Sequence, residues 1–353
     1  MKPQSSSDAR ATIDDVAKAA GVSIKTVSRV VNNEPNVRAA TRERVEQAIE
    51  KLDYRPNTAA RRLAGNRSYL FALVYDDPSQ YVNATANYVT NLQGGALKRA
   101  RESGYDLLIH PCDVADPGVV EEIRRLIEHS RIDGLLLAPP LAEVKSIARM
   151  LSQLGKPSVR ISPGDDQGYD AVDTNDREVC AEMTSYLASL GHRDIAFIQG
   201  NPDHRALEHR EAGYLDGLAR SGLPVKTSLL VRGDNSFDSG IACARRLLKR
   251  KRRPTAIFAS NDDMAAGVMQ AAHEMGIAIP SELSVAGFDD VPLSRQVWPA
   301  LSTIHQPTFE MGELATDLLF RQLNGEELTT PTRVDSRLVI RQSTDVPNKD
   351  QAE

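Results

Sequence analysis

The 353-residue chain is too long for one ordinary domain, so two or three compact units are expected. Its hydrophobic content of 41% and charged content of 26% are typical of a soluble globular protein, and no run of about 18 apolar residues predicts a membrane span. The N-terminal stretch MKPQSSSDARAT lacks the apolar segment of a secretory signal. We therefore expect a cytoplasmic protein that makes no contact with a membrane.

Charge is distributed unevenly along the chain. Residues 1–67 carry 13 Lys and Arg against 8 Asp and Glu, whereas residues 68–353 carry 30 against 40. A basic head on an acidic body favours a polyanionic partner for the head alone.

Residues 13–20 form the first predicted helix, because apolar residues recur there at helical spacing. Thr12 precedes it as a candidate N-cap, with Asp15 three residues later. Gly21 then breaks the pattern. This predicts a short helix that ends in a turn.

Two further helices follow. Ser23 caps the second, in which Val27 and Val30 face inward, and Thr41 is the candidate cap of a third helix that runs to about residue 54. A small residue at Ala17, a glycine four positions later and Val27 six beyond that fit a helix-turn-helix.

The outer face of the second helix predicts contacts with double-stranded DNA. Lys25 and Arg29 can donate to guanine, whereas Ile24 can only make apolar contact, for example with a thymine methyl group. The remaining candidates for DNA contacts in this region are polar and suited to setting register on phosphates: Thr12, Ser23, Thr26, Ser28 and Asn32.

The stretch that begins TIDDVAKAAGVSIKTVSRVV at Thr12 and ends YRPNTAARRLAG at Gly65 resembles the DNA-binding headpiece of the LacI/GalR family of bacterial repressors. The resemblance implies a headpiece at 11–55 and a hinge helix or linker at 56–67. It also implies that Leu63 wedges between bases in the minor groove and kinks the DNA, and that Asn57 and Ala60 support the paired hinge helices of a homodimer.

Beyond residue 67, buried apolar runs alternate with amphipathic helical stretches, as in open parallel sheets with helices on both faces. The predicted strands are 69–75, 105–112, 133–139, 156–162, 194–200, 255–260 and 284–290. The predicted fold class is therefore a small all-α helix-turn-helix headpiece followed by a two-lobed α/β domain built from doubly wound parallel sheets.

Polar residues gather where these strands end, and ligands bind at that edge of such sheets. Asp76, Ser162, Asn261 and Asp289 follow strands, and Arg210 begins a helix. Carboxylates, an amide and a guanidinium suit a hydroxyl-rich ligand. Asp and Asn after a strand are equally common as helix caps, so each residue has both interpretations.

The segments GHRDIAFIQG, PTAIFASNDDMAAGVMQ and PALSTIHQP resemble the family's effector domain, which has the fold of periplasmic sugar-binding proteins. The resemblance implies an effector-binding and dimerisation domain at 68–346, with an N-lobe at 68–167 and 299–330 and a C-lobe at 168–298 and 331–346. It places Asp76, Ser162, Arg210, Asn261 and Asp289 at effector-binding positions, and Asn235 or Phe237 where an aromatic often stacks on the ligand. Trp298 and Tyr75 are alternative stacking residues.

The sequence thus favours a DNA-binding transcriptional regulator, a repressor controlled by a sugar or another metabolite, and both induction and co-repression stay open. A transporter's sugar-binding protein is the alternative, but it requires a signal peptide and no basic head. The sequence contains no H-E-x-x-H, G-x-S-x-G or Walker A motif, so we expect neither an enzyme nor a cofactor. Cys112, Cys180 and Cys243 are odd in number and widely spaced, which favours buried, reduced thiols over disulfides or a metal site.

Overall fold

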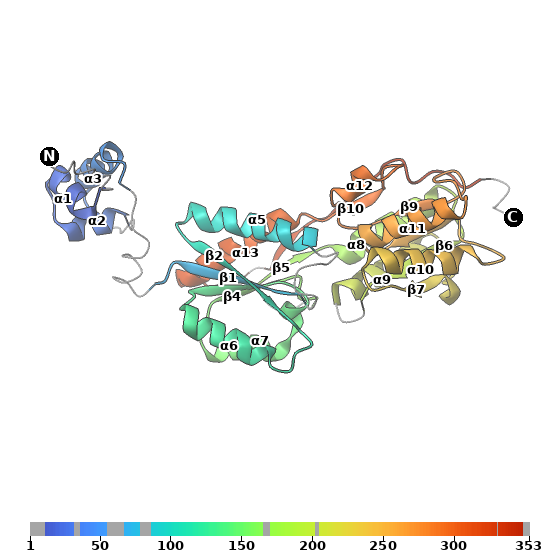
Figure 1. Cartoon of the computed structure of the whole chain (residues 1–353), viewed down its shortest axis with the longest axis horizontal. Helices are drawn as coiled ribbons and strands as arrows, with labels where there is room; N and C mark the ends of the chain where they lie inside the picture. The colour runs from blue at the N-terminus through green and yellow to red at the C-terminus, as the bar shows by residue number, and fades with distance from the viewer. Residues whose placement is uncertain are drawn as a thin grey trace, which may run out of the picture. The chain divides into compact units, whose positions relative to one another are not determined.

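A computed structural model describes residues 11–31, 36–54, 67–77, 86–164, 170–201, 205–329 and 331–348, apart from the side chain of residue 86. The chain divides into two compact units, Met1–Tyr69 and Leu70–Glu353. Helices alone form the first unit within these residues, and the second contains parallel sheets (Figure 1). Four candidate DNA contacts, Asn32, Asn57, Ala60 and Leu63, lie outside the described residues. Within the described ranges no helix is long and apolar enough to cross a membrane.

The first unit, here called the headpiece, contains α1 (Ile13–Ala20), α2 (Ile24–Val31) and α3 (Ala39–Lys51). Their buried apolar side chains form one core: Val16, Ala17, Ala20, Val27, Val30, Val45 and Ala48. Gly21 ends α1 with a φ of 63°, a left-handed conformation that glycine adopts without strain. The turn predicted at Gly21 is confirmed.

The predicted start of the third helix is wrong. Thr41 lies inside α3, which begins at Ala39, and Arg38 occupies the N-cap position without a capping side chain. The backbone N–H of Thr41 instead donates to the carbonyl of Arg38 at 2.9 Å. A threonine within the first turn resembles a cap in sequence because the same residue types occur at both places.

The second unit, here called the effector unit, begins with a six-stranded parallel sheet of order β11-β5-β4-β3-β1-β2. Its strands are β1 (Leu70–Asp76), β2 (Asp106–Cys112), β3 (Gly134–Leu137), β4 (Ser158–Ile161), β5 (Ala171–Thr174) and β11 (Thr332–Val334). Helices α5 (Ala86–Glu102) and α13 (Thr308–Leu323) cover one face, and α6 (Val119–Ser130) and α7 (Lys145–Gln153) cover the other (Figure 1). Because β1 is covered on both faces, its apolar run is continuous rather than alternating.

A second parallel sheet has the order β7-β6-β8-β9. It consists of β6 (Ile195–Gln199), β7 (Leu230–Arg232), β8 (Ala256–Ala259) and β9 (Ser284–Ala286). Helices α8 (Asp176–Ser189) and α9 (Arg205–Arg220) pack on one face, and α10 (Phe237–Leu248) and α11 (Asp262–Glu274) pack on the other. Each of the predicted strands corresponds to a strand of one of the two parallel sheets, and the predicted fold class is confirmed.

The remaining elements are α12 (Leu293–Gln296), two short 3-10 helices at Leu141–Glu143 and Thr227–Leu229, and an antiparallel pair of β10 (Thr303–His305) with β12 (Arg337–Val339). The hydrogen bonds of the strands show where the chain passes from one sheet to the other. β5 and β11 pair with each other in the six-stranded sheet, whereas β10 is bridged to the end of β9. The chain therefore passes between the two sheets after β5, after β10 and after β11.

Candidate functional site

The outer face of α2 exposes the side chains that are expected to read DNA. Ile24 is 46% exposed, and Lys25 is also exposed, whereas Ser28 and Arg29 are half-buried. Val27 and Val30 point into the headpiece core. The helix thus has an apolar inner face and an outer face that carries the ammonium group of Lys25, the apolar side chain of Ile24 and several hydroxyl groups.

Hydroxyls at the ends of these helices already make hydrogen bonds. Ser23 Oγ accepts from the backbone N–H of Thr26 at 3.2 Å, so Ser23 caps α2 as predicted. Thr12 and Asp15 form a reciprocal capping box at α1, and the hydrogen bond from Thr12 lowers the pKa of Asp15. The predicted DNA contacts of Thr12, Ser23 and Thr26 would thus come from groups that also stabilise the helix ends.

In the effector unit, Arg210 occupies the centre of a buried polar cluster. Its Nε donates to Asp176 Oδ2 at 3.0 Å, and its Nη1 donates to the carbonyl of Ser260 at 2.6 Å and approaches Asp289 Oδ1 at 3.4 Å. The guanidinium also lies over the Phe288 ring, 3.5 Å from its centroid. Four partners therefore fix the orientation of one buried cation.

The carboxyl of Asp289 is held in an unusual state. Burial raises the pKa of Asp289 to about 7, against the opposing charge of Arg210. Its backbone φ of 109° lies in the region that L residues rarely adopt. Strained backbone of this kind persists where surrounding structure enforces it, often at binding sites.

Three buried hydroxyls surround this cluster without a hydrogen-bond partner among the described residues: Tyr88 Oη on α5, Ser162 Oγ after β4 and Ser260 Oγ after β8. Burial raises the pKa of Tyr88, whereas the neighbouring Ser162 hydroxyl lowers it, so the two hydroxyls lie close together without a hydrogen bond of good geometry. The charges of Asp176, Arg210 and Asp289 also act on Tyr88, which places its hydroxyl beside the cluster. Buried polar groups are nearly always bonded in folded proteins. Their unused capacity therefore suits a polar ligand.

Asn235 and Asn261 form a second polar group beside Ser260. Asn261 Oδ1 accepts from the backbone N–H of Met264, which caps α11, and its Nδ2 donates to the carbonyl of Asn235 at 2.8 Å. A Cβ on Gly200 would lie 2.2 Å from Asn235 Oδ1 and 3.1 Å from Ser260 Oγ, so these atoms are neighbours around that glycine. Asn261 is thus a helix cap whose amide also orders the loop before α10.

The candidate aromatic residues differ in their surroundings. Phe237 begins α10, two residues after Asn235, and its side chain is 40% exposed. Trp298 is 90% exposed, and Tyr75 is half-buried within β1. Phe237 alone is close in sequence to the asparagine pair.

Asp76 lies at the end of β1, where Oδ1 accepts from the backbone N–H of Val114 at 2.8 Å. Asp262, next to Asn261, is fully buried and accepts from Thr303 Oγ1 and from the N–H of Val291. Asp262 therefore connects the segments after β9 and at β10 to α11, which is a structural role.

Sequence reasoning missed Asp176, Tyr88 and Ser260. Asp176 is the first residue of α8 and follows β5, a strand of four residues that was not predicted. The stretch AVDTND was the available signal, because it ends in polar residues like the recognised strand ends. Tyr88 gave no signal, since an aromatic on a helix is more often part of a core.

Comparisons with known proteins agree with this architecture. Residues 12–57 match the bacterial regulatory proteins of the lacI family, and residues 184–344 match a periplasmic binding protein-like domain. The chain is 31% identical to catabolite control protein A of Priestia megaterium, over 94% of this chain and 99% of that protein. It is 34% identical to the ribose operon repressor of Escherichia coli K12, over 94% and 97% of the two chains.

Two solved structures are similar over nearly the whole chain. The lac repressor dimer bound to operator and an anti-inducer has a TM-score of 0.74 and 29% identity, covering 95% of this chain and 99% of that one. The complex of the transcriptional regulator CelR with cellobiose has a TM-score of 0.71 and 30% identity, covering 95% and 100%. With its helix-turn-helix headpiece and two-sheet effector unit, the chain belongs to the lacI family of bacterial regulatory proteins and is a DNA-binding transcriptional regulator.

Proposed function

We propose that this chain is a transcriptional repressor whose binding to DNA is controlled by a sugar held among the polar side chains around Arg210. The observation that carries the proposal is the buried guanidinium, fixed by Asp176 and Asp289, with three unpartnered hydroxyls beside it. A sugar hydroxyl both donates and accepts. It can therefore donate to a carboxylate and accept from a guanidinium, and it can do either with a serine or tyrosine hydroxyl.

In this proposal the hydroxyl of Tyr88 forms a hydrogen bond with the sugar, and Phe237 stacks on a sugar ring. The ligand also contacts Arg210, Asp289, Ser162, Asn261 and Asn235. Arginine held rigidly by carboxylates loses little freedom on binding, which favours affinity. Asp76 is a further candidate contact at the end of β1. The ribose operon repressor and the CelR–cellobiose complex support a sugar rather than another metabolite.

On the DNA side, we infer that a homodimer presents two copies of α2 to a palindromic operator. Lys25 and Arg29 contact guanines, Ile24 contacts a thymine methyl group, and hydroxyls of the headpiece contact phosphates. The lac repressor dimer bound to operator supports this arrangement. Leu63, outside the described residues, kinks the centre of the operator, which we expect to be a deformable CG, CA/TG or TA step.

The proposed domain bounds are 11–55 for DNA binding, 56–67 for the hinge and 68–346 for effector binding and dimerisation. We further propose that the protein acts in the cytoplasm, where its DNA lies, and that it catalyses no reaction and needs no cofactor. The regulatory relatives support this.

The proposal is tested by removing one unpartnered hydroxyl. A duplex is selected from a random library with the full-length protein, and mono- and disaccharides are screened by thermal shift, because a ligand of the native state raises the melting temperature. Tyr88→Phe should weaken binding of the identified sugar about tenfold, the effect of losing one hydrogen bond of roughly 1.4 kcal/mol. Duplex affinity in the absence of sugar should not change.

The matched control is Tyr105→Phe, which removes the hydroxyl of a buried tyrosine at the opposite end of β2 from the candidate site. It should leave sugar affinity unchanged. If both variants bind the sugar like the parent, the cluster around Arg210 is not the effector site. If no sugar shifts the melting temperature, the proposed ligand class is wrong.

A further inference from the structure

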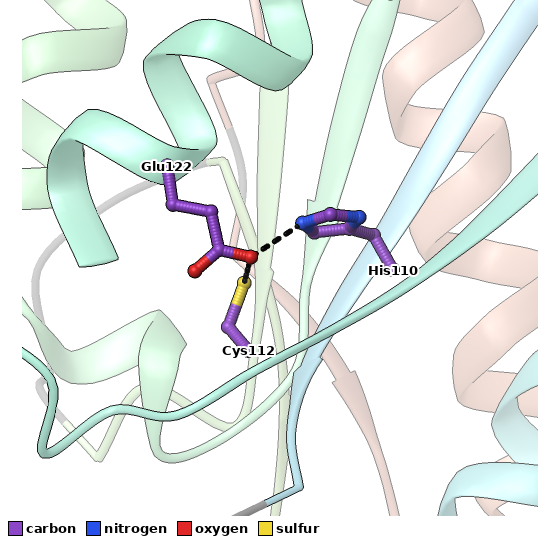
Figure 2. A group of neighbouring side chains, drawn as sticks. All are labelled: His110, Cys112 and Glu122. Carbon is purple, nitrogen blue, oxygen red and sulfur yellow. Dashed lines mark hydrogen bonds and ion pairs between the residues drawn. The ribbon is translucent and has the colours of Figure 1, made fainter. Parts of the chain in front are cut away.

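His110, Cys112 and Glu122 form a side-chain cluster that the proposed effector site does not use. His110 and Cys112 lie two residues apart on β2, so their side chains share one face of this edge strand. Glu122 lies in the first turn of α6, which packs on that face. Figure 2 shows the three side chains converging from the strand and the helix.

The polar atoms of the cluster are within the reach of one ion. His110 Nε2 lies 2.9 Å from Glu122 Oε1, and Cys112 Sγ lies 3.7 Å from the same oxygen (Figure 2). All three ligand atoms lie within 4.8 Å of one another. Zinc binds nitrogen, oxygen and sulfur at about 2.0–2.3 Å in tetrahedral geometry, so ligand atoms around it lie about 3–4 Å apart. The separations of 2.9 Å and 3.7 Å from Glu122 Oε1 are close to this range.

The three side chains differ in their exposure to solvent. Cys112 is 4% exposed and contacts the apolar core beneath α6, whereas the side chains of His110 and Glu122 are 26% and 36% exposed. An ion can therefore approach from solvent between the imidazole and the carboxylate and reach the sulfur behind them.

We propose that His110, Cys112 and Glu122 bind a zinc ion through Nε2, Sγ and a carboxylate oxygen, with water as the fourth ligand. A thiolate and an imidazole favour zinc over magnesium or calcium, which prefer oxygen ligands. The spacing of the three cysteines in the sequence gives no hint of this site, because two of its ligands are not cysteines.

Binding requires a proton to leave the sulfur. Burial, together with the charge of Glu122, raises the pKa of Cys112 to about 12, so the thiol is protonated at neutral pH without metal. The Zn–S bond forms as the S–H bond breaks, and the proton passes to solvent. The His110 proton must reside on Nδ1 so that Nε2 can bind the ion.

The test uses the untagged full chain, freed of metal with a chelator and titrated with Co²⁺, then with Zn²⁺. Co²⁺ bound by a thiolate gives a sulfur-to-metal charge-transfer band in the near ultraviolet, and tetrahedral coordination gives strong visible bands. One Co²⁺ per chain should produce both, and Zn²⁺ should displace it. Absence of the charge-transfer band at saturating Co²⁺ would overturn the proposal.

Variants assign the ligands. Cys112→Ser should abolish the charge-transfer band, and Glu122→Gln, at a half-exposed position that should not affect folding, should weaken Co²⁺ binding at least about tenfold. Cys243→Ser is the matched control, since Cys243 is a second buried thiol whose Sγ donates to the Arg232 carbonyl. A band that survives Cys112→Ser, or binding unchanged in Glu122→Gln, contradicts the assigned ligand set.

Discussion

The headpiece and the effector unit present their candidate functional side chains in opposite ways. In the headpiece, Lys25 and Ile24 are exposed on one short helix, and the core beneath them is apolar. In the effector unit, Arg210 is 5% exposed and its partners come from segments as far apart as Asp176 and Asp289. The exposed face suits the proposed contact with DNA, whereas the buried cluster suits the proposed small polar ligand.

In the headpiece, a side chain proposed to contact DNA can therefore be changed with little effect on stability. Around Arg210, the same side chains would serve both ligand binding and stability. An exposed side chain such as Lys25 can be removed without leaving a buried group unpaired. A buried cation cannot, because its counter-charges then remain out of water without compensation. Variants in the headpiece should therefore change DNA affinity alone, whereas variants around Arg210 should change the free energy of unfolding as well.

The largest expected effect is on the stability of the effector unit. Arg210→Met leaves Asp176 and Asp289 without their cation, and breaking a buried ion pair in this way typically costs about 3–5 kcal/mol. Urea unfolding followed by far-ultraviolet circular dichroism measures the loss, because most of the helices and strands lie in this unit.

Two further variants make the result specific. Arg177→Met breaks a solvent-exposed pair with Asp216 and should cost at most about 1 kcal/mol. Adding Asp176→Asn to Arg210→Met should recover part of the loss, since it removes the buried carboxylate to which Arg210 Nε donates. Equal destabilisation by the two arginine variants would mean that the Arg210 cluster contributes no more than a surface contact.

The regions also differ in how much of them could be predicted from sequence. The headpiece signals are local: Thr12 with Asp15, Gly21 and Ser23 act within a few residues of their own position, and all were identified. The error at Thr41 was also local, because the observed N-cap, Arg38, lies three residues earlier. Caps and turns depend on hydrogen bonds between residues a few positions apart, so a short stretch of sequence is enough to predict them.

In the effector unit, strand length did not decide which strands were predictable, since β9 has three residues and was predicted. β5 has four residues, of which two are buried, and β7, β10, β11 and β12 each contain half-buried or exposed residues, so their apolar patterns are weak. Missing β5 hid Asp176. Tyr88 was missed because its relation to Arg210 depends on tertiary packing between distant segments. The pattern of residues along the chain does not indicate such tertiary contacts.

The second prediction concerns DNA binding. Lys25→Ala should weaken binding to the selected duplex by about 1–3 kcal/mol, the usual contribution of one specific base contact, while the free energy of unfolding stays within about 0.5 kcal/mol of the parent. Fluorescence anisotropy over a range of salt concentrations measures the affinity. Lys51→Ala, at the exposed end of α3, removes the same charge from the headpiece and should have a smaller effect. Equal losses would mean that Lys25 contributes charge alone.

The smallest expected effect is a pH dependence that only the effector unit should show. Because the pKa of Asp289 is raised to about 7, its carboxyl becomes ionised between pH 6 and pH 8. If a sugar hydroxyl donates to the ionised form, sugar affinity should rise about tenfold over that interval, the ratio of ionised fractions for a pKa near 7. Isothermal titration calorimetry at several pH values measures this rise.

The free energy of unfolding should instead fall as the pH rises. A carboxyl whose folded pKa exceeds its unfolded value stabilises the fold fully below the unfolded pKa, and this contribution is lost as pH rises through about 7. Buried His192, whose pKa burial lowers, opposes this trend because its protonation at lower pH favours unfolding. Asp289→Asn isolates the carboxyl, since it should remove the pH dependence of sugar affinity and the matching part of the stability profile. Identical pH profiles of parent and variant for both quantities would show that Asp289 does not titrate in this range. The contrast between Asp289 and the exposed Lys25 of the headpiece would then rest on burial alone.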